Sequence, residues 1–124
     1  MMKVLIVDDS EALVQRLRSS LGKVSGVEIV GQAGDATEGT LQIRQAKPDV
    51  VILDVQMPGG SGIDVLENLK KDTHQPVVIM LSNYNYPQYR RKCLENGAHF
   101  YFDKSSEFHM VAEVLRDMTN ATAT

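Results

Sequence analysis

Cysteine is nearly missing from this sequence of 124 residues, with Cys93 as its single thiol. One thiol excludes an internal disulfide and any metal site built from several cysteines, which suits a reducing compartment. The three histidines, His74, His99 and His109, are scattered and do not form a ligand set. Long hydrophobic runs are missing too, because the first one, Val4–Val7, is interrupted at once by two aspartates and is too short for a signal peptide or a membrane span. We therefore expect a soluble, cytoplasmic protein that does not act at a membrane.

An excess of positive charge is also missing. The sequence has 13 Lys and Arg against 16 Asp and Glu, a net charge of −3. Because nucleic-acid binding needs a basic face, this balance argues against direct binding of nucleic acid. The sequence shows no internal repeat, low-complexity run or linker, and its length suits one domain with its own core. We expect that domain to span residues 1–119, with a polar tail over 120–124.

Short apolar runs alternate with stretches of helical periodicity along the whole chain. The runs predict buried strands at residues 3–7, 27–33, 50–53, 76–81 and 99–102. Helix-start signals follow these runs at Ser10, Asp35, Ser61, Pro87 and Ser105 or Ser106. This alternation predicts an α/β fold, a doubly wound five-stranded parallel sheet with helices on both faces. In such a sheet, ligands bind beyond the carboxyl ends of the strands.

The apolar run Val50–Leu53 ends on a carboxylate, Asp54, and then turns through Pro58 and three glycines. A carboxylate at the end of a buried strand gains nothing from packing, since burial disfavours its charged form. Asp54 is therefore either a rim residue in water or a working group in a site.

Polar residues follow or end three other predicted strands as well. They are Asp8 and Asp9 at the first strand, Ser82 at the fourth and Lys104 at the fifth. If the sheet order is 2-1-3-4-5, these residues converge with Asp54 on one pocket. Two carboxylates 4 Å apart repel by about 4 kcal/mol at an effective dielectric constant near 20, so one lysine cannot offset three such pairs. The all-oxygen donor set predicts Mg²⁺, or Mn²⁺ in its place, in a site that handles a phosphoryl group.

Asp54 is the predicted acceptor of that group. An aspartate is anionic at pH 7 and can attack phosphorus without a general base, which gives an acyl phosphate. Asp54 lies centrally between the acidic pair and the pair formed by Ser82 and Lys104. The metal and Lys104 would stabilise charge on the equatorial phosphoryl oxygens, and the Ser82 hydroxyl would donate to one of them.

The joint pattern resembles the receiver domain of two-component response regulators over essentially the whole chain. It consists of Asp8-Asp9, Asp54-x-x-Met57-Pro58-x-x-x-Gly62, Ser82 and Tyr101-x-x-Lys104. The resemblance implies a flavodoxin-like (βα)5 fold of order 2-1-3-4-5. It also implies Mg²⁺-dependent phosphotransfer to Asp54 from the phosphohistidine of a sensor histidine kinase or of a histidine phosphotransfer protein. Such a protein is a signalling switch that catalyses only its own phosphorylation and dephosphorylation.

The resemblance further assigns roles to single residues. The implied metal ligands are Asp9, Asp54 and the backbone carbonyl of Gln56, with Asp8 acting largely through water. Ser82 and Tyr101 match the family's switch pair: phosphorylated Asp54 draws the serine hydroxyl inward, and the tyrosine moves into the vacated space. The face made by the fourth helix, fifth strand and fifth helix then changes and binds a downstream protein of unknown identity.

Some positions depart from the family pattern. Asn83 occupies a place where the family usually has Ala or Gly, and we expect it to tune access to the phosphoryl group together with Gln56 and Tyr84. Lys104 is followed by serine instead of the frequent proline, so we expect this loop to be set differently. We expect no DNA-binding or enzymatic domain to follow this one. We therefore expect a stand-alone form, either a monomer or a phosphorylation-dependent dimer.

Other interpretations remain open for the same residues. Taken alone, Asp8 and Asp9 reflect the preference of aspartate for a helix's first turn, and Tyr101 is a half-buried strand aromatic. A phosphatase that forms an aspartyl phosphate would carry Asp-x-Asp after its first strand, whereas this chain has adjacent aspartates. A flavodoxin-like electron carrier shares the topology, but the two aspartates would repel the FMN phosphate.

The predicted fourth helix combines basic and aromatic residues. Its run Arg90–Lys92 is either a solvated face or part of a docking surface, and Tyr84, Tyr86 and Tyr89 crowd the same region. Cys93 is expected to be a packed helix residue. Whether the switch acts as an adaptor, a relay intermediate or a phosphate sink is left open by the sequence.

Overall fold

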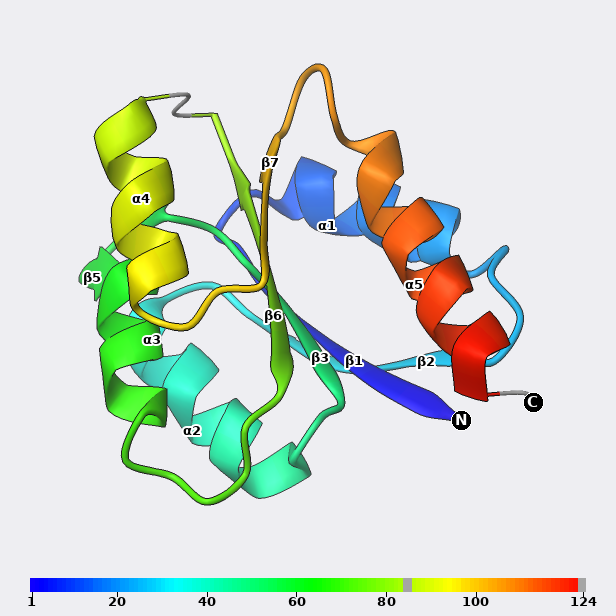
Figure 1. Ribbon diagram of the computed structural model, residues 1–124, viewed down its shortest axis with the longest axis horizontal. Coiled ribbons are helices and arrows are strands. Elements are labelled where there is room, and N and C mark those ends of the chain that lie inside the picture. Colours follow the sequence, from blue (N-terminus) through cyan, green and yellow to red (C-terminus); the bar gives the residue numbers. More distant parts are fainter. Residues whose placement is uncertain (84–85, 123–124) are drawn as a thin grey trace.

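A five-stranded sheet lies at the centre of the computed structural model, which describes residues 1–83 and 86–122 (Figure 1). All neighbouring strands in it are parallel, in the order β2-β1-β3-β6-β7. The strands are β1 (Met2–Val7), β2 (Val27–Ala33), β3 (Val50–Leu53), β6 (Val77–Ser82) and β7 (Phe100–Asp103). The predicted fold class and the strand order expected from the resemblance are confirmed.

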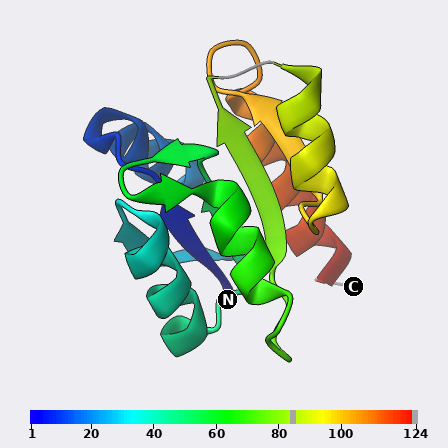
Figure 2. The same ribbon diagram turned by 90° about the vertical axis from the view of Figure 1, so that its left-hand side faces the viewer.

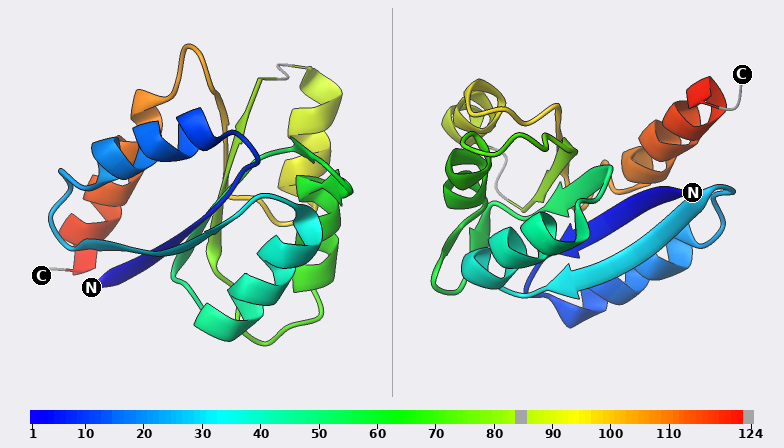
Figure 3. Two further views of the ribbon diagram at one scale, coloured as in Figure 1. Left: turned by 180° about the vertical axis from the view of Figure 1, so that it is seen from behind. Right: turned by 90° about the horizontal axis from the view of Figure 1, so that it is seen from below.

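Helices cover both faces of this sheet. One face carries α1 (Glu11–Leu21) and α5 (His109–Thr122), and the other carries α2 (Ala36–Ala46), α3 (Gly62–Leu69) and α4 (Pro87–Glu95). Figure 1 shows the two layers on either side of the sheet, Figure 2 turns the layer of α2, α3 and α4 toward the viewer, and Figure 3 shows the molecule from behind and from below. Parallel strands need such crossovers, because a tight hairpin can join only antiparallel neighbours. No helix in the described part of the chain has the length and apolar character needed to cross a membrane.

The central strands are buried on both sides, and successive residues face opposite layers. In β1, Leu5 and Val7 pack with the layer of α2, α3 and α4, whereas Val4 and Ile6 pack with α1 and α5. β3 and β6 repeat this alternation. Two buried faces explain why these strands are continuous apolar runs in the sequence instead of alternating apolar and polar residues.

Side-chain caps fix the starts of three helices where the sequence predicted them. The Ser10 hydroxyl accepts from the Leu13 N–H at 3.3 Å, and the Asp35 carboxylate accepts from the Glu38 N–H at 2.8 Å. Ser61 forms a reciprocal capping box at the start of α3. Because α1 begins a few residues after β1 ends, the Ser10 cap also sets the direction in which the chain leaves that strand.

Several boundaries differ from the prediction. α5 begins at His109, too far along the chain for Ser105 or Ser106 to cap it, and the N–H groups of both serines donate to the Asp103 carboxylate. α5 also continues through residues 120–122, part of the predicted tail, since no glycine or proline stands there to end the helix. The turn after Asp54 contains a small hairpin that was missed, β4 (Gln56–Met57) with β5 (Gly60–Ser61), which protrudes in Figure 2.

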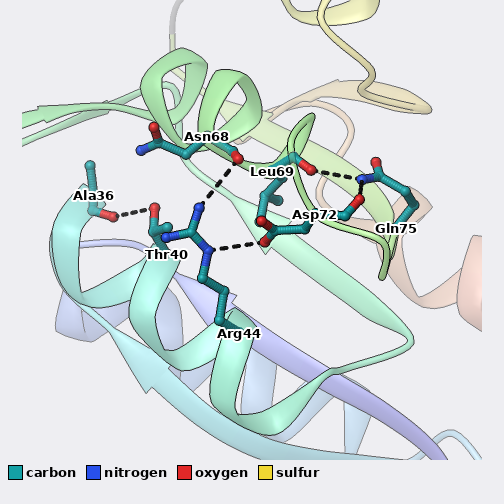
Figure 4. A network of polar contacts seen from close by, with 7 residues as sticks. All are labelled: Ala36, Thr40, Arg44, Asn68, Leu69, Asp72 and Gln75. Carbon is teal, nitrogen blue, oxygen red and sulfur yellow. Dashed lines mark hydrogen bonds and ion pairs between the residues drawn. The ribbon is translucent and has the colours of Figure 1, made fainter.

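A polar network links α2 to the connection between α3 and β6 (Figure 4). The Arg44 Nε lies 3.0 Å from Oδ2 of Asp72, and its Nη2 donates to the Asn68 carbonyl at 3.3 Å. The Gln75 amide donates to the carbonyls of Leu69 and Asp72, both at 2.7 Å. These exposed contacts each add little stability, but together they order a long connection at the edge opposite the carboxyl ends of the strands.

Candidate functional site

Four strand ends bring their polar residues together at one edge of the sheet. Asp8 and Asp9 follow β1, Asp54 follows β3, Ser82 ends β6 and Lys104 follows β7. The carboxyl end of β6 and the connection from β7 to α5 lie at this edge, at the top of Figure 1. A pocket of about 460 Å³ opens there and is lined by Asp9, Ser10, Asp54, Gln56, Met57, Pro58, Asn83 and Lys104. The structure therefore places the predicted site residues on one pocket or directly behind it.

Three carboxylates form the acidic part of the site. One oxygen from each of Asp8, Asp9 and Asp54 lies within 4.8 Å of the other two. Asp8 and Asp54 are buried, whereas Asp9 is exposed at the pocket. Carboxylates this close repel strongly in a buried place unless cations neutralise them. Because an all-oxygen donor set is the one that Mg²⁺ takes, the cluster fits a divalent cation.

Lys104 supplies the positive charge on the protein side. Its Nζ lies 2.9 Å from Oδ2 of Asp8 and 3.3 Å from Oδ2 of Asp54, and its side chain is only 11% exposed. Burial by itself lowers the pKa of Lys104, but the hydrogen bond and charge of Asp8 and the charge of Asp54 outweigh it and hold the pKa above its usual value. The Lys104 N–H also donates to the Ser82 carbonyl at 2.9 Å, which extends the ladder between β6 and β7 by one residue.

Asp54 is the group whose charge the fold penalises most clearly. Burial, and after it the charge of Asp8, raises the pKa of Asp54 from 3.8 to about 6, against the lowering effects of Lys104 and of the Gln56 N–H. At pH 7 a carboxyl group with this pKa is still about 90% ionised, so Asp54 can act as a nucleophile. A cation beside it would favour the charged form further.

Asp8 is held in place from two sides. Its Oδ1 accepts from the Ser10 N–H at 2.8 Å, and its Oδ2 pairs with Lys104. Because protein donors engage both of its oxygens, Asp8 suits an indirect contact to a cation. Asp9 lines the open pocket and suits a direct contact. Gln56 is exposed and lines the same pocket, and the role of its carbonyl as a ligand stays a prediction.

A steric clash explains why position 62 is a glycine, which the sequence motif alone did not reveal. A Cβ at this position would lie 2.2 Å from the backbone oxygen of Asp54, far inside contact distance. The Gly62 N–H also donates to the Val55 carbonyl at 2.8 Å. The start of α3 therefore packs directly on the backbone of the predicted acceptor, and any side chain at Gly62 would displace it.

Ser82 and Tyr101 are buried side by side behind the pocket. Ser82 is fully buried, and Tyr101 is 4% exposed. Burial raises the pKa of Tyr101, and the hydrogen bond with the Ser82 side chain opposes this rise. Tyr101 thus occupies an inward position in this structure. Asn83 lines the pocket, and its effect on access stays a prediction, while Tyr84 lies outside the described residues.

Asp103 is an organising residue that the sequence interpretation missed. Its Oδ1 accepts from the N–H groups of Ser105 at 2.8 Å and Ser106 at 3.0 Å, and these bonds lower the pKa of Asp103. Its own N–H donates to Glu107 Oε1 at 3.0 Å, and the Glu107 N–H donates back to the Asp103 carbonyl at 2.9 Å. These bonds order the loop that carries Lys104 without a proline. The Asp-x-Ser-Ser spacing, typical of side-chain-capped turns, was the available signal.

A doubly wound sheet with buried carboxylates, a lysine and a hydroxyl at the carboxyl ends of its strands defines a class of proteins that handle a phosphoryl group beside a divalent cation. Within this class the family is shown by sequence: the response regulator receiver domain matches residues 4–116. The chain belongs to the receiver domain family of two-component response regulators.

Individual relatives agree with this assignment. The transcriptional regulatory protein BtsR of Escherichia coli is 38% identical over 104 residues, which cover 84% of this chain and 42% of BtsR. The response regulator domain of Thermotoga maritima CheB has a TM-score of 0.83 and 30% identity, covering 100% of this chain and 98% of that one. A chain of the CheX–CheY–BeF3–Mg²⁺ complex from Borrelia burgdorferi has a TM-score of 0.83 and 31% identity, covering 95% and 87%.

The curated relatives are longer proteins. The chain spans about half their length, from 42% to 58% of those compared. Because BtsR is by name a transcriptional regulator, the expectation that this chain does not itself bind nucleic acid stays a prediction.

Proposed function

We propose that this protein is a phosphorylation switch in which Asp54 accepts a phosphoryl group from the phosphohistidine of a sensor histidine kinase or of a histidine phosphotransfer protein. The observation that carries the proposal is the buried Asp54 carboxylate, which lines an open pocket. Its Oδ2 lies 3.3 Å from the Lys104 Nζ, and the carboxylates of Asp8 and Asp9 lie beside it. Membership of the receiver domain family supports the phosphoryl donor and the signalling role. The cytoplasmic location and the oligomeric state expected from the sequence stay predictions.

The transfer step follows from the position of Asp54. A carboxylate oxygen forms a bond to phosphorus while the phosphorus–nitrogen bond of the phosphohistidine breaks, and the departing imidazole takes up a proton. Lys104 already contacts Asp54 and can reach an oxygen of the transferred group from the same position. Its ammonium group would stabilise the negative charge that remains on the acyl phosphate.

The acidic residues hold the metal in this proposal. Asp9, Asp54 and the Gln56 carbonyl would bind Mg²⁺, or Mn²⁺ in its place, with Asp8 acting through water. When bound, the cation neutralises charge on the carboxylates and on the phosphoryl oxygens. The Asp8 carboxylate meanwhile keeps Lys104 aimed at the pocket through their 2.9 Å ion pair.

Ser82 and Tyr101 would carry the signal away from Asp54. A phosphoryl oxygen on Asp54 can accept a hydrogen bond from the Ser82 hydroxyl, and Tyr101 packs against Ser82 from the next strand. To move a two-state equilibrium from one-tenth to nine-tenths active takes about 2.6 kcal/mol of differential stabilisation. Charge-assisted hydrogen bonds at about 1.5–3 kcal/mol each can supply it. The α4–β7–α5 face would then bind the downstream protein.

Labelling with radioactive acetyl phosphate tests the acceptor directly. The wild-type protein should take up label in the presence of Mg²⁺, and EDTA should abolish the uptake. Asp54→Asn should take up none, while Asp117→Asn, an exposed aspartate on α5, should behave as the wild type. Stable labelling of Asp54→Asn would refute the assignment. A pull-down with and without beryllofluoride, a phosphoryl mimic, would then distinguish an adaptor from a relay intermediate or a phosphate sink.

A further inference from the structure

Arg90 on α4 contacts Tyr101 at two points, which its position in a basic helical run did not predict. Its Nη1 donates to the Tyr101 carbonyl at 3.0 Å, across the gap between α4 and β7. Its guanidinium carbon also lies 6.0 Å from the centre of the Tyr101 ring, at the outer limit of a cation–π contact. One side chain therefore holds both the backbone and the ring of this tyrosine.

The opposite end of Tyr101 is held by the site. Its hydroxyl is hydrogen-bonded with the Ser82 side chain, and Ser82 ends the strand next to β7. The ring packs in the same buried cluster as Cys93, a fully buried residue of α4. The tyrosine is thus fixed between the phosphoacceptor site on one side and α4 on the other.

We propose that Arg90 is a positioning residue that holds Tyr101 inward and thereby couples α4 to the phosphoacceptor site. If the ring turns outward while the guanidinium stays on the carbonyl, the cation–π contact is lost, and if the guanidinium follows the ring, its hydrogen bond to the carbonyl is lost. A hydrogen bond from a charged donor together with a weak cation–π contact shifts a two-state equilibrium by roughly tenfold. Any displacement of α4 by a partner would reach Ser82 through the same contacts. The coupling to Asp54 rests on the proposed function, whereas the effect on Tyr101 itself does not.

Fluorine NMR of protein labelled with 3-fluorotyrosine tests the first part. Tyr101→Phe identifies the Tyr101 signal in the unphosphorylated protein. Arg90→Ala should shift or split this signal, with the ratio of inward to outward ring falling roughly tenfold. Arg90→Gln keeps a donor for the carbonyl but loses the charge, so its shift should be intermediate. Arg91→Ala removes the same charge from a neighbouring exposed position and should leave the signal unchanged.

Beryllofluoride binding in the presence of Mg²⁺ tests the coupling. Arg90→Ala should bind more weakly than the wild type, by up to about tenfold, and Arg91→Ala should bind as well as the wild type. A Tyr101 signal that is the same in Arg90→Ala and Arg91→Ala would overturn the proposal, and so would equal beryllofluoride affinities. A wild-type protein that fails to bind beryllofluoride would overturn the proposed function instead, while the Tyr101 signals would still report on Arg90.

Discussion

Asp54 is expected to destabilise the metal-free protein at neutral pH. Burial first and Asp8 second raise the pKa of its carboxyl group from 3.8 to about 6. Because one pKa unit corresponds to about 1.4 kcal/mol, the ionised Asp54 lowers the free energy of unfolding by about 3 kcal/mol. Asn has the same shape and no charge. Asp54→Asn should therefore raise the free energy of unfolding at neutral pH by about 3 kcal/mol, because the pKa of about 6 already includes the lowering effect of Lys104.

The pH dependence gives this prediction its sign. Below pH 3.8 the Asp54 carboxyl group is protonated in both the folded and the unfolded protein, so the wild type and Asp54→Asn should be equally stable. Between pH 3.8 and about 6 the unfolded state loses the proton first, and the stability of the wild type falls relative to the variant. Above about pH 6 the difference should stay constant.

Urea unfolding followed by circular dichroism in EDTA, at several pH values from about 4 to 7.5, measures this difference. Asp117→Asn is the control for removing an exposed charge and should show no such trend. Added Mg²⁺ should stabilise the wild type, because a ligand that binds the folded state raises stability. It should not stabilise Asp54→Asn, because the variant lacks one of the carboxylates proposed to bind the cation. Two results would refute the reasoning: Asp54→Asn is no more stable than the wild type near neutral pH, or the difference does not grow with pH. Either would mean that burial does not make the ionised Asp54 destabilising in the absence of a cation.

Three further variants probe the surroundings of the acceptor. Gly62→Ala should lower the free energy of unfolding in urea by about 1–3 kcal/mol and reduce labelling of Asp54, because its Cβ would collide with the Asp54 backbone. Gly34→Ala, where a Cβ has room, should lose much less stability. Asp103→Ala should speed hydrogen exchange at the Ser105 amide and slow labelling of Asp54, and Asp103→Asn, which keeps an acceptor, should restore much of both. Asp9→Asn should weaken Mg²⁺ binding by about tenfold or more in calorimetry, and an unchanged affinity would remove Asp9 from the ligand set.

The sequence by itself determined the sheet and the position of the site. The runs Val50–Leu53 and 76–81 are apolar without interruption, and only strands buried on both faces need that composition. Their alternation with helices requires parallel crossovers, and parallel strands all end at the same edge. Asp54, Ser82 and Lys104 could therefore be placed together before any coordinates, since strand ends are a matter of local pattern.

Tertiary structure decided what depends on contacts between distant elements. Arg90 contacts the carbonyl and the ring of Tyr101, a residue 11 positions further along the chain on β7. A run of basic residues in the sequence does not indicate such a partner. The reason for Gly62 lies in the backbone oxygen of Asp54, and the pKa of Asp54 depends on burial beneath neighbouring elements. α5 likewise extends into the predicted tail, through residues 120–122, because that stretch has no glycine or proline to end the helix. Local pattern fixes where polar groups leave the strands, but packing fixes which of them touch.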